Sequence, residues 1–167
     1  MAVVGVPSLP GGTDLVLDAN IFVYAFLGTS QQCRDLLDRC AREDVYGFTT
    51  IEVVTEVCHR LMLAEAVASG TITKESVSAL KGKHAPIRGL TQYWTMTAGM
   101  FALNIPIVNL NEARMRRSQN MRANHGLLTR DSLILAAADE YGIDALATND
   151  SDFDHVSWVT IYKPGDI

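Results

Sequence analysis

Short, strongly apolar runs alternate along the chain with longer segments in which apolar residues recur at helical spacing. The apolar runs predict strands at residues 14–18, 45–49, 105–110, 145–148 and 158–162. Strands that alternate with helices favour a parallel sheet covered by helices on both faces. The sequence therefore predicts an α/β fold with a central parallel sheet of four to five strands.

The segments between these runs have the apolar spacing of amphipathic helices. The expected helices occupy residues 19 onward, 30–42, 50–66, 73–81, 90–103, 111–121 and 129–141. We expect residues 82–89 to form a connection and residues 122–126 to form a loop, because glycine, proline and small polar residues gather there.

The composition is that of one globular domain. Its 167 residues can bury a substantial core, and 48% hydrophobic with 20% charged residues is not the balance of a disordered chain. We expect a single domain at residues 13–167, preceded by a flexible arm at residues 1–12. No apolar run is long enough to span a membrane, and three cysteines without metal-site spacing favour a reducing cytoplasm.

Four acidic residues stand where expected strands end or helices begin: Asp18, Glu56, Asp131 and Asp150. A parallel sheet presents the carboxyl ends of its strands along one edge, where ligands bind. Carboxylates gathered there repel one another unless a cation lies between them, and Mg²⁺ or Mn²⁺ prefers oxygen ligands. This pattern predicts a metal site, which would activate water and neutralise phosphate charge.

Simpler roles exist for the same residues. Asp131 could serve only as a helix cap, and Glu52 lies one helical turn before Glu56 on nearly the same face. Asp152 follows Asp150 closely enough to be an accessory ligand. Because Glu52 and Glu56 lie on nearly the same helix face, either could be the fourth acidic residue of the site, and Glu56 is preferred.

Positive charge gathers in one stretch, although the formal net charge of the chain is −5. Its members are Arg114, Arg116, Arg117, Arg122, His125 and Arg130. From this group we select Arg122, His125 and Arg130 as candidate phosphate contacts. The alternative is a solvated helix face followed by a mobile loop.

The acids, in this order and context, resemble those of a PIN domain, over roughly residues 14–162. The segments that carry the resemblance are LVLDANIFVYAF, FTTIEVVTEVCHRL and LTRDSLILAAADEYGIDALATNDSDF. By position, Asp18, Glu56, Asp131 and Asp150 match the acidic quartet of that family. Asn20 matches its small polar residue after the first aspartate, and Thr148 matches its threonine before the last acid.

The resemblance implies a three-layer α/β/α domain and a ribonuclease that depends on Mg²⁺ or Mn²⁺. Such domains are most often toxins of VapC-type toxin–antitoxin pairs. An RNA substrate, a homodimer and an antitoxin whose segment inserts into the acidic groove are therefore expected.

The sequence leaves two alternative functions. One is a PIN-like RNA-processing or RNA-binding protein outside any toxin–antitoxin pair. The other is a Mg²⁺-dependent phosphatase with an acidic pocket, which is disfavoured because Asn20 stands where a D-x-D motif needs its second aspartate.

Overall fold

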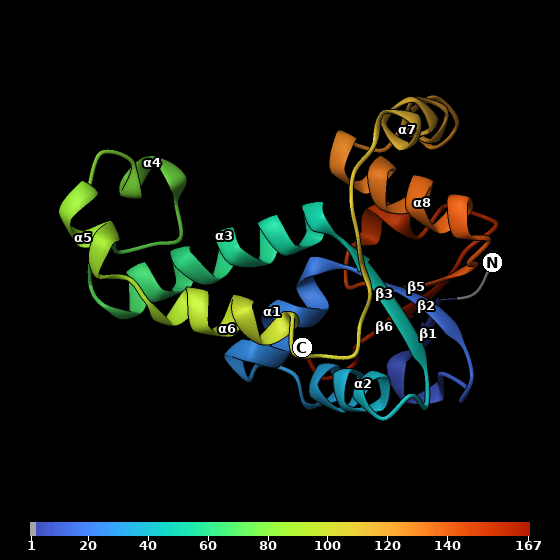
Figure 1. The fold of residues 1–167 in the computed structure, drawn as a ribbon, viewed down its shortest axis with the longest axis horizontal. Helices are drawn as coiled ribbons and strands as arrows, with labels where there is room; N and C mark the ends of the chain where they lie inside the picture. Colours follow the sequence, from blue (N-terminus) through green and yellow to red (C-terminus); the bar gives the residue numbers. More distant parts are fainter. Residues whose placement is uncertain (1–2) are drawn as a thin grey trace.

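Six parallel strands form one sheet in the computed structural model, which describes residues 3–167 (Figure 1). The strands are β1 (Val3–Gly5), β2 (Asp14–Leu17), β3 (Tyr46–Thr50), β4 (Ile107–Val108), β5 (Ala145–Ala147) and β6 (Thr160–Lys163). They lie in the order β1-β6-β5-β2-β3-β4. The chain leaves β2 toward β3 and β4, and later returns to β5 on the other side of β2. The junction of β2 and β5 is thus the switch point at which α/β sheets form ligand sites.

Eight α-helices connect the strands of the described chain. They are α1 (Ala19–Leu27), α2 (Gln31–Ala41), α3 (Ile51–Ala68), α4 (Val77–Leu80), α5 (His84–Gly89), α6 (Gln92–Met100), α7 (Glu112–His125) and α8 (Thr129–Tyr141). Figure 1 shows α7 and α8 on one side of the sheet and α1 and α2 on the other. The predicted three-layer α/β/α fold is therefore confirmed, although the sheet has six strands and not the predicted four to five.

Local capping explains where several helices begin. The hydroxyl of Ser30 accepts a hydrogen bond from the amide of Cys33 at 3.0 Å, and Thr50 accepts one from Val53 at 3.4 Å. Each side chain satisfies one of the free amides of a first helical turn. Central strand residues such as Leu15 and Leu146 are fully buried. Buried strands hold their carboxyl ends, and the residues that follow, in fixed positions.

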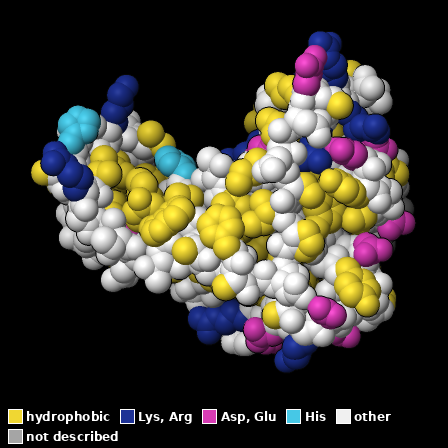
Figure 2. Space-filling model, in the orientation of Figure 1, with side chains coloured by type: hydrophobic (Ala, Val, Ile, Leu, Met, Phe, Trp, Pro, Cys, Tyr) yellow, Lys and Arg dark blue, Asp and Glu magenta, His cyan; other side chains and the backbone are white. Residues whose placement is uncertain are grey.

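A second, smaller apolar cluster stabilises a projection that we call the lateral lobe, residues 61–100. Its buried members are Leu63, Ala66, Ile72, Leu80 and Leu90. The lobe consists of the end of α3 with α4, α5 and α6, and it extends away from the sheet (Figure 1). Figure 2 shows the surface hollowed between this lobe and the helices α7 and α8.

Several elements differ from the sequence-based expectation. Residues 3–5 are not part of a flexible arm, because they pair with β6 as an additional edge strand, and Val6 and Leu9 are buried in the core. Residues 1 and 2 lie outside the described residues. The expected loop at residues 122–126 is instead the last turn of α7, which ends at Gly126 with a φ of 65°. Residues 84–89, expected to be a connection, form the short helix α5.

Among the residues that the structure describes, no helix has the length and apolar character needed to cross a bilayer.

Candidate active site

Asp18 directly follows β2 and caps the first turn of α1. Its Oδ1 accepts a hydrogen bond from the amide of Ala19 at 2.6 Å. Its Oδ2 accepts two more, from Asn20 Nδ2 at 2.8 Å and from Thr148 Oγ1 at 2.7 Å. The residue is 9% exposed. These donors hold the carboxylate in one orientation at the edge of the sheet.

Thr148 directly follows β5 and joins the ends of the two central strands. Its fully buried hydroxyl donates to Asp18 and accepts hydrogen bonds from Asn20 Nδ2 at 3.1 Å and from the amide of Asp150 at 3.0 Å. Asn20 Oδ1 in turn accepts the amide of Asn149 at 3.0 Å. The predicted accessory residues Asn20 and Thr148 are thus brought together, and they fix the loop that carries Asp150.

Asp150 and Asp152 belong to one short turn. Asp150 Oδ1 accepts the amide of Asp152 at 2.9 Å, at the start of the 3₁₀ helix Ser151–Phe153. Asp150 is partly buried, whereas Asp152 is exposed. Asp152 lies close enough to raise the pKa of Asp131 slightly, so it stands at the rim of the acidic cluster.

Asp131 lies in the first turn of α8 and does not cap that helix, since the capping position is Leu128. Burial, together with the negative charges of Asp150 and Asp18, raises the pKa of Asp131 to about 6. Burial also raises the pKa of Asp18, against the opposing hydrogen bonds from Thr148 and Ala19. Three carboxylates from separate parts of the chain are therefore close together, and the charge of Asp150 disfavours ionisation of the other two.

An ion pair with Arg130 connects Glu56 to this cluster. On α3, its carboxylate forms an ion pair with Arg130, the residue immediately before Asp131. The side chain of Glu56 is 18% exposed and that of Arg130 is 51% exposed. The guanidinium of Arg130 also lowers the pKa of Asp18 and that of Asp131. Arg130 thus partly neutralises the acidic cluster.

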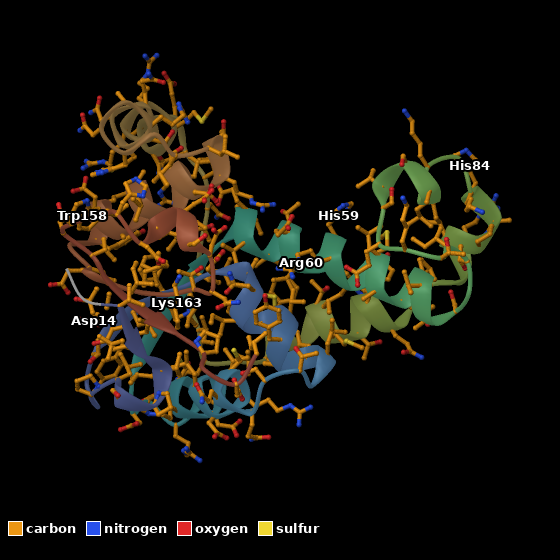
Figure 3. All side chains as sticks on the ribbon, turned by 180° about the vertical axis from the view of Figure 1, so that it is seen from behind. Asp14, His59, Arg60, His84, Trp158 and Lys163 are labelled. Atoms are coloured by element: carbon orange, nitrogen blue, oxygen red, sulfur yellow. The ribbon has the colours of Figure 1, made fainter. Side chains whose placement is uncertain are left out.

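The two candidate glutamates occupy the same cavity. This cavity, of about 420 Å³, lies between α3 and α8 and is lined by Glu52, Thr55, Glu56, His59, Thr129, Arg130 and Leu133. Figure 3 shows His59 on the side of α3 that faces the hollow between α8 and the lateral lobe. Both carboxylate oxygens of Glu52 are buried without a hydrogen-bond partner among the described residues. A larger cavity, of about 530 Å³, contains none of the predicted acidic residues.

The donor set fits a hard divalent cation. Asp18, Asp131 and Asp150 offer only oxygen ligands, which Mg²⁺ and Mn²⁺ prefer. The charge of Asp150 contributes to the raised pKa values of Asp18 and Asp131, and a cation would relieve this repulsion. Within residues 3–167, no three acidic, histidine or cysteine side chains already converge as a ligand set. Acidic side chains other than the fixed Asp18 would therefore have to turn toward an ion.

Most arginines of the predicted basic stretch form contacts within the protein. Arg114 is 1% exposed and pairs with Glu140 at 2.7 Å, while Arg116 and Arg117 form ion pairs on the surface. Arg122 donates to the hydroxyls of Ser118 and Ser132, both at 3.0 Å.

His125 contacts His155 through its backbone carbonyl, at 2.6 Å from Nε2. Of the three selected phosphate contacts, Arg130 alone has a contact with one of the predicted acidic residues.

Sequence reasoning missed two features of this cavity. One is the ion pair between Arg130 and Glu56, and the other is the burial of Glu52. The sequence signal for the ion pair was the position of Arg130 next to Asp131. Neighbouring residues at the start of a helix reach the same region, so Arg130 could be expected near the acidic residues.

The fold and the acidic edge define an α/β protein with a carboxylate cluster at the ends of two parallel strands. The chain belongs to the PIN domain family, whose family model matches residues 15–159. The predicted resemblance is thereby confirmed.

Individual relatives extend this likeness over nearly the whole chain. Ribonuclease VapC6 of Methanocaldococcus jannaschii is 21% identical over 156 residues, which cover 90% of this chain and 97% of the relative. The structure of VapBC2 from Rickettsia felis bound to a promoter DNA fragment matches with a TM-score of 0.58 at 17% identity, covering 90% of this chain and 98% of that chain.

Mycobacterium tuberculosis VapC20, a toxin that cleaves the sarcin–ricin loop, gives a TM-score of 0.58 at 11% identity, with 89% and 98% coverage. At these identities the solved structures establish the shared fold.

Proposed function

We propose that this protein is a metal-dependent endoribonuclease that hydrolyses RNA phosphodiester bonds at the junction of β2 and β5. The observation that carries the proposal is the placement of Asp18 and Asp150 on one shared hydroxyl, that of Thr148, at the joined ends of β2 and β5 in a PIN-family chain. Asp131 lies close enough to both for their charges to raise its pKa. Carboxylates held close together in partly buried positions are costly without a cation, so their placement at one edge of the sheet favours a metal-binding role.

Each side chain has a role in this reaction. Asp18, Asp131 and Asp150 would hold Mg²⁺ or Mn²⁺, with Asp152 as an accessory ligand at the rim. A bound divalent cation supplies a water of lowered pKa and offsets the charge of the phosphate. Glu56 would orient the attacking water by accepting its proton or a hydrogen bond. Asn20 and Thr148 keep the Asp18 carboxylate aimed into the site.

Arg130 would bind phosphate oxygens of the RNA substrate. Its guanidinium is half exposed at the cavity between α3 and α8, so a phosphate can reach it without displacing packed side chains. Guanidinium groups form strong, directional hydrogen bonds with phosphate. Arg122 and His125 are less suited, because Arg122 is bonded to Ser118 and Ser132 within the fold.

RNA cleavage with Mg²⁺ or Mn²⁺ tests the proposal directly. The wild type should cut RNA with either ion, EDTA should abolish cleavage, and Asp18→Asn should be inactive while remaining folded by circular dichroism. Activity that persists in EDTA and in Asp18→Asn would refute the metal–carboxylate mechanism. Release of inorganic phosphate from phosphomonoesters, without RNA cleavage, would favour the phosphatase alternative.

We also propose that the protein acts in the cytoplasm as a homodimeric toxin with a cognate antitoxin. The VapC6 relative and the VapBC complexes among the structural matches support this assignment. Expression of the wild type should slow growth, and Asp131→Asn should relieve the effect. Normal growth despite active ribonuclease would instead favour an RNA-processing role outside a toxin–antitoxin pair.

A further inference from the structure

Glu52 is unusual among the acidic residues that the structure describes, because both of its carboxylate oxygens are buried and lack any hydrogen-bond partner. It lies in the first turn of α3, one helical turn before Glu56. A buried carboxylate without a partner is costly, since it loses its water contacts and gains nothing in return. Such a group is expected to receive a cation in some state of the protein.

Arg130 is the cation in the best position to reach Glu52. Both residues line the cavity between α3 and α8, and Arg130 is held there by an ion pair with Glu56. Residues four apart on a helix project from the same face, with about 6 Å between their Cβ atoms. The side chain of Arg130 is half exposed, which leaves its guanidinium room to move between the two carboxylates.

His59 is the other potential cation in this cavity. It lies one turn beyond Glu56 and two turns beyond Glu52 on the same helix, so its spacing favours a contact with Glu56. Its exposed ring faces the hollow (Figure 3). The remaining lining residues, Thr55, Thr129 and Leu133, carry no charge. Arg130 is thus the natural partner for Glu52.

We propose that Glu52 is a positioning residue: when a divalent cation enters the acidic cluster, Arg130 leaves Glu56 and forms an ion pair with Glu52. We call this change of partner the exchange. The inference rests on the proposed metal-dependent function and describes how that same site is completed. In the metal-free protein Arg130 neutralises the cluster through Glu56. Cation binding makes this position unfavourable for a guanidinium, because two positive groups would compete for the same carboxylates.

The exchange has two consequences. Glu56 becomes free to act on water or on the ion, and Glu52 gains the partner that it lacks. Arg130 remains in the cavity, where a substrate phosphate can still reach it. The energetic coupling between Glu52 and Arg130 should therefore appear in the affinity of the protein for the ion itself, before any RNA is bound.

A double-mutant cycle on Mn²⁺ affinity tests this exchange. We suggest isothermal titration calorimetry of the full-length wild type, Glu52→Gln, Arg130→Ala and the double variant, each checked for folding in EDTA by circular dichroism. Glu52→Gln should weaken Mn²⁺ binding by about three- to tenfold when Arg130 is present. In the Arg130→Ala background the same change should weaken it by less than about twofold. Glu75→Gln, an exposed charge in the lateral lobe, is the matched control and should change nothing.

The other outcomes separate the possible failures. An equal loss in both backgrounds would show that Glu52 acts on the ion independently of Arg130 and would overturn the exchange. No loss in either background would overturn it as well. Saturable Mn²⁺ binding that Asp18→Asn abolishes would leave the proposed function standing in both cases. Wild-type protein without saturable Mn²⁺ binding would refute the proposed metal site, and the exchange with it.

NMR of isotope-labelled arginine gives a second, direct readout with diamagnetic Mg²⁺. The Arg130 Nε resonance should shift on Mg²⁺ addition and keep the slow guanidinium rotation of an ion pair. In Glu52→Gln, Mg²⁺ should release the group to fast rotation. An Arg130 resonance that is insensitive to Mg²⁺ in the wild type would contradict the exchange.

Discussion

Replacement of Asp131 by asparagine should stabilise the metal-free protein at neutral pH. Burial raises the pKa of Asp131 to about 6, from an ordinary value of 3.8, and the charges of Asp150 and Asp18 contribute to the rise. The ionised carboxylate is therefore less favourable in the folded state than in the unfolded state. Asparagine has nearly the same shape and no charge, so it removes this repulsion.

The size of the effect follows from the interval between the two pKa values. An interval of about 2 pKa units corresponds to about 3 kcal/mol, at roughly 1.4 kcal/mol per unit. Asp131 is only partly buried, so solvent screening reduces this figure, and we expect a gain of about 1–2 kcal/mol at pH 7.5.

The pH dependence has a definite sign. Because the folded-state pKa is raised, the wild type is relatively most stable below the unfolded-state value of 3.8 and loses stability as the pH rises through about 6. The advantage of the variant should therefore grow between about pH 3.8 and 6 and level off above.

Urea unfolding in EDTA at a series of pH values measures this difference. Asp38→Asn, at an exposed position on α2, serves as the control and should stay within about 0.5 kcal/mol of the wild type. Saturating Mg²⁺ should reduce or reverse the advantage of Asp131→Asn, since the ion stabilises the protein that binds it better. A variant that is less stable than the wild type at pH 7.5 in EDTA, or a gain independent of pH, would refute the reasoning.

Three further predictions concern the stability of the protein. Thr148→Val should lower the free energy of unfolding by about 1–3 kcal/mol in urea titrations, because it leaves polar groups of Asp18 and its neighbours without a buried partner. Arg114→Ala should cost about 3 kcal/mol, since its buried guanidinium pairs with Glu140, whereas the exposed Arg116→Ala should cost less than about 1 kcal/mol. Addition of Mn²⁺ at about 100 times its Kd should stabilise the wild type by about 2.7 kcal/mol, measured by thermal unfolding, and EDTA should reverse this gain.

The sheet and its acidic edge could be predicted because each rests on a local pattern. Apolar runs such as residues 14–18 are short, continuous and followed by a polar residue, so strand and strand end are both encoded within a few positions. The parallel arrangement then brings the ends of β2 and β5 together without any further information. Asp18, Thr148 and Asp150 needed only this topology.

The strand β1 was not predicted, and the reason is physical. Its three residues lie next to Pro7 and Pro10, which favour a loop, and the stabilising hydrogen bonds come from β6 at the far end of the chain. A pairing between such distant segments leaves no local signal in a run of three residues. The same holds for the basic stretch, where burial of Arg114 depends on Glu140 in another helix.

The side chains whose contacts or burial the sequence did not predict, Glu52, Glu56 and Arg130, lie together on α3 and α8. The candidate site therefore has two halves. Asp18 and Thr148 follow buried strands and are fixed by hydrogen bonds, so their geometry is set by folding. Glu56 and Arg130 project from helix surfaces into a cavity, and within residues 3–167 the side-chain contact that holds each of them is their ion pair. A fixed half can define where an ion binds, while an adjustable half can exchange partners as ion and substrate arrive. Mutations in the first half should therefore change stability and metal binding together, whereas mutations in the second half should change metal binding with little effect on stability.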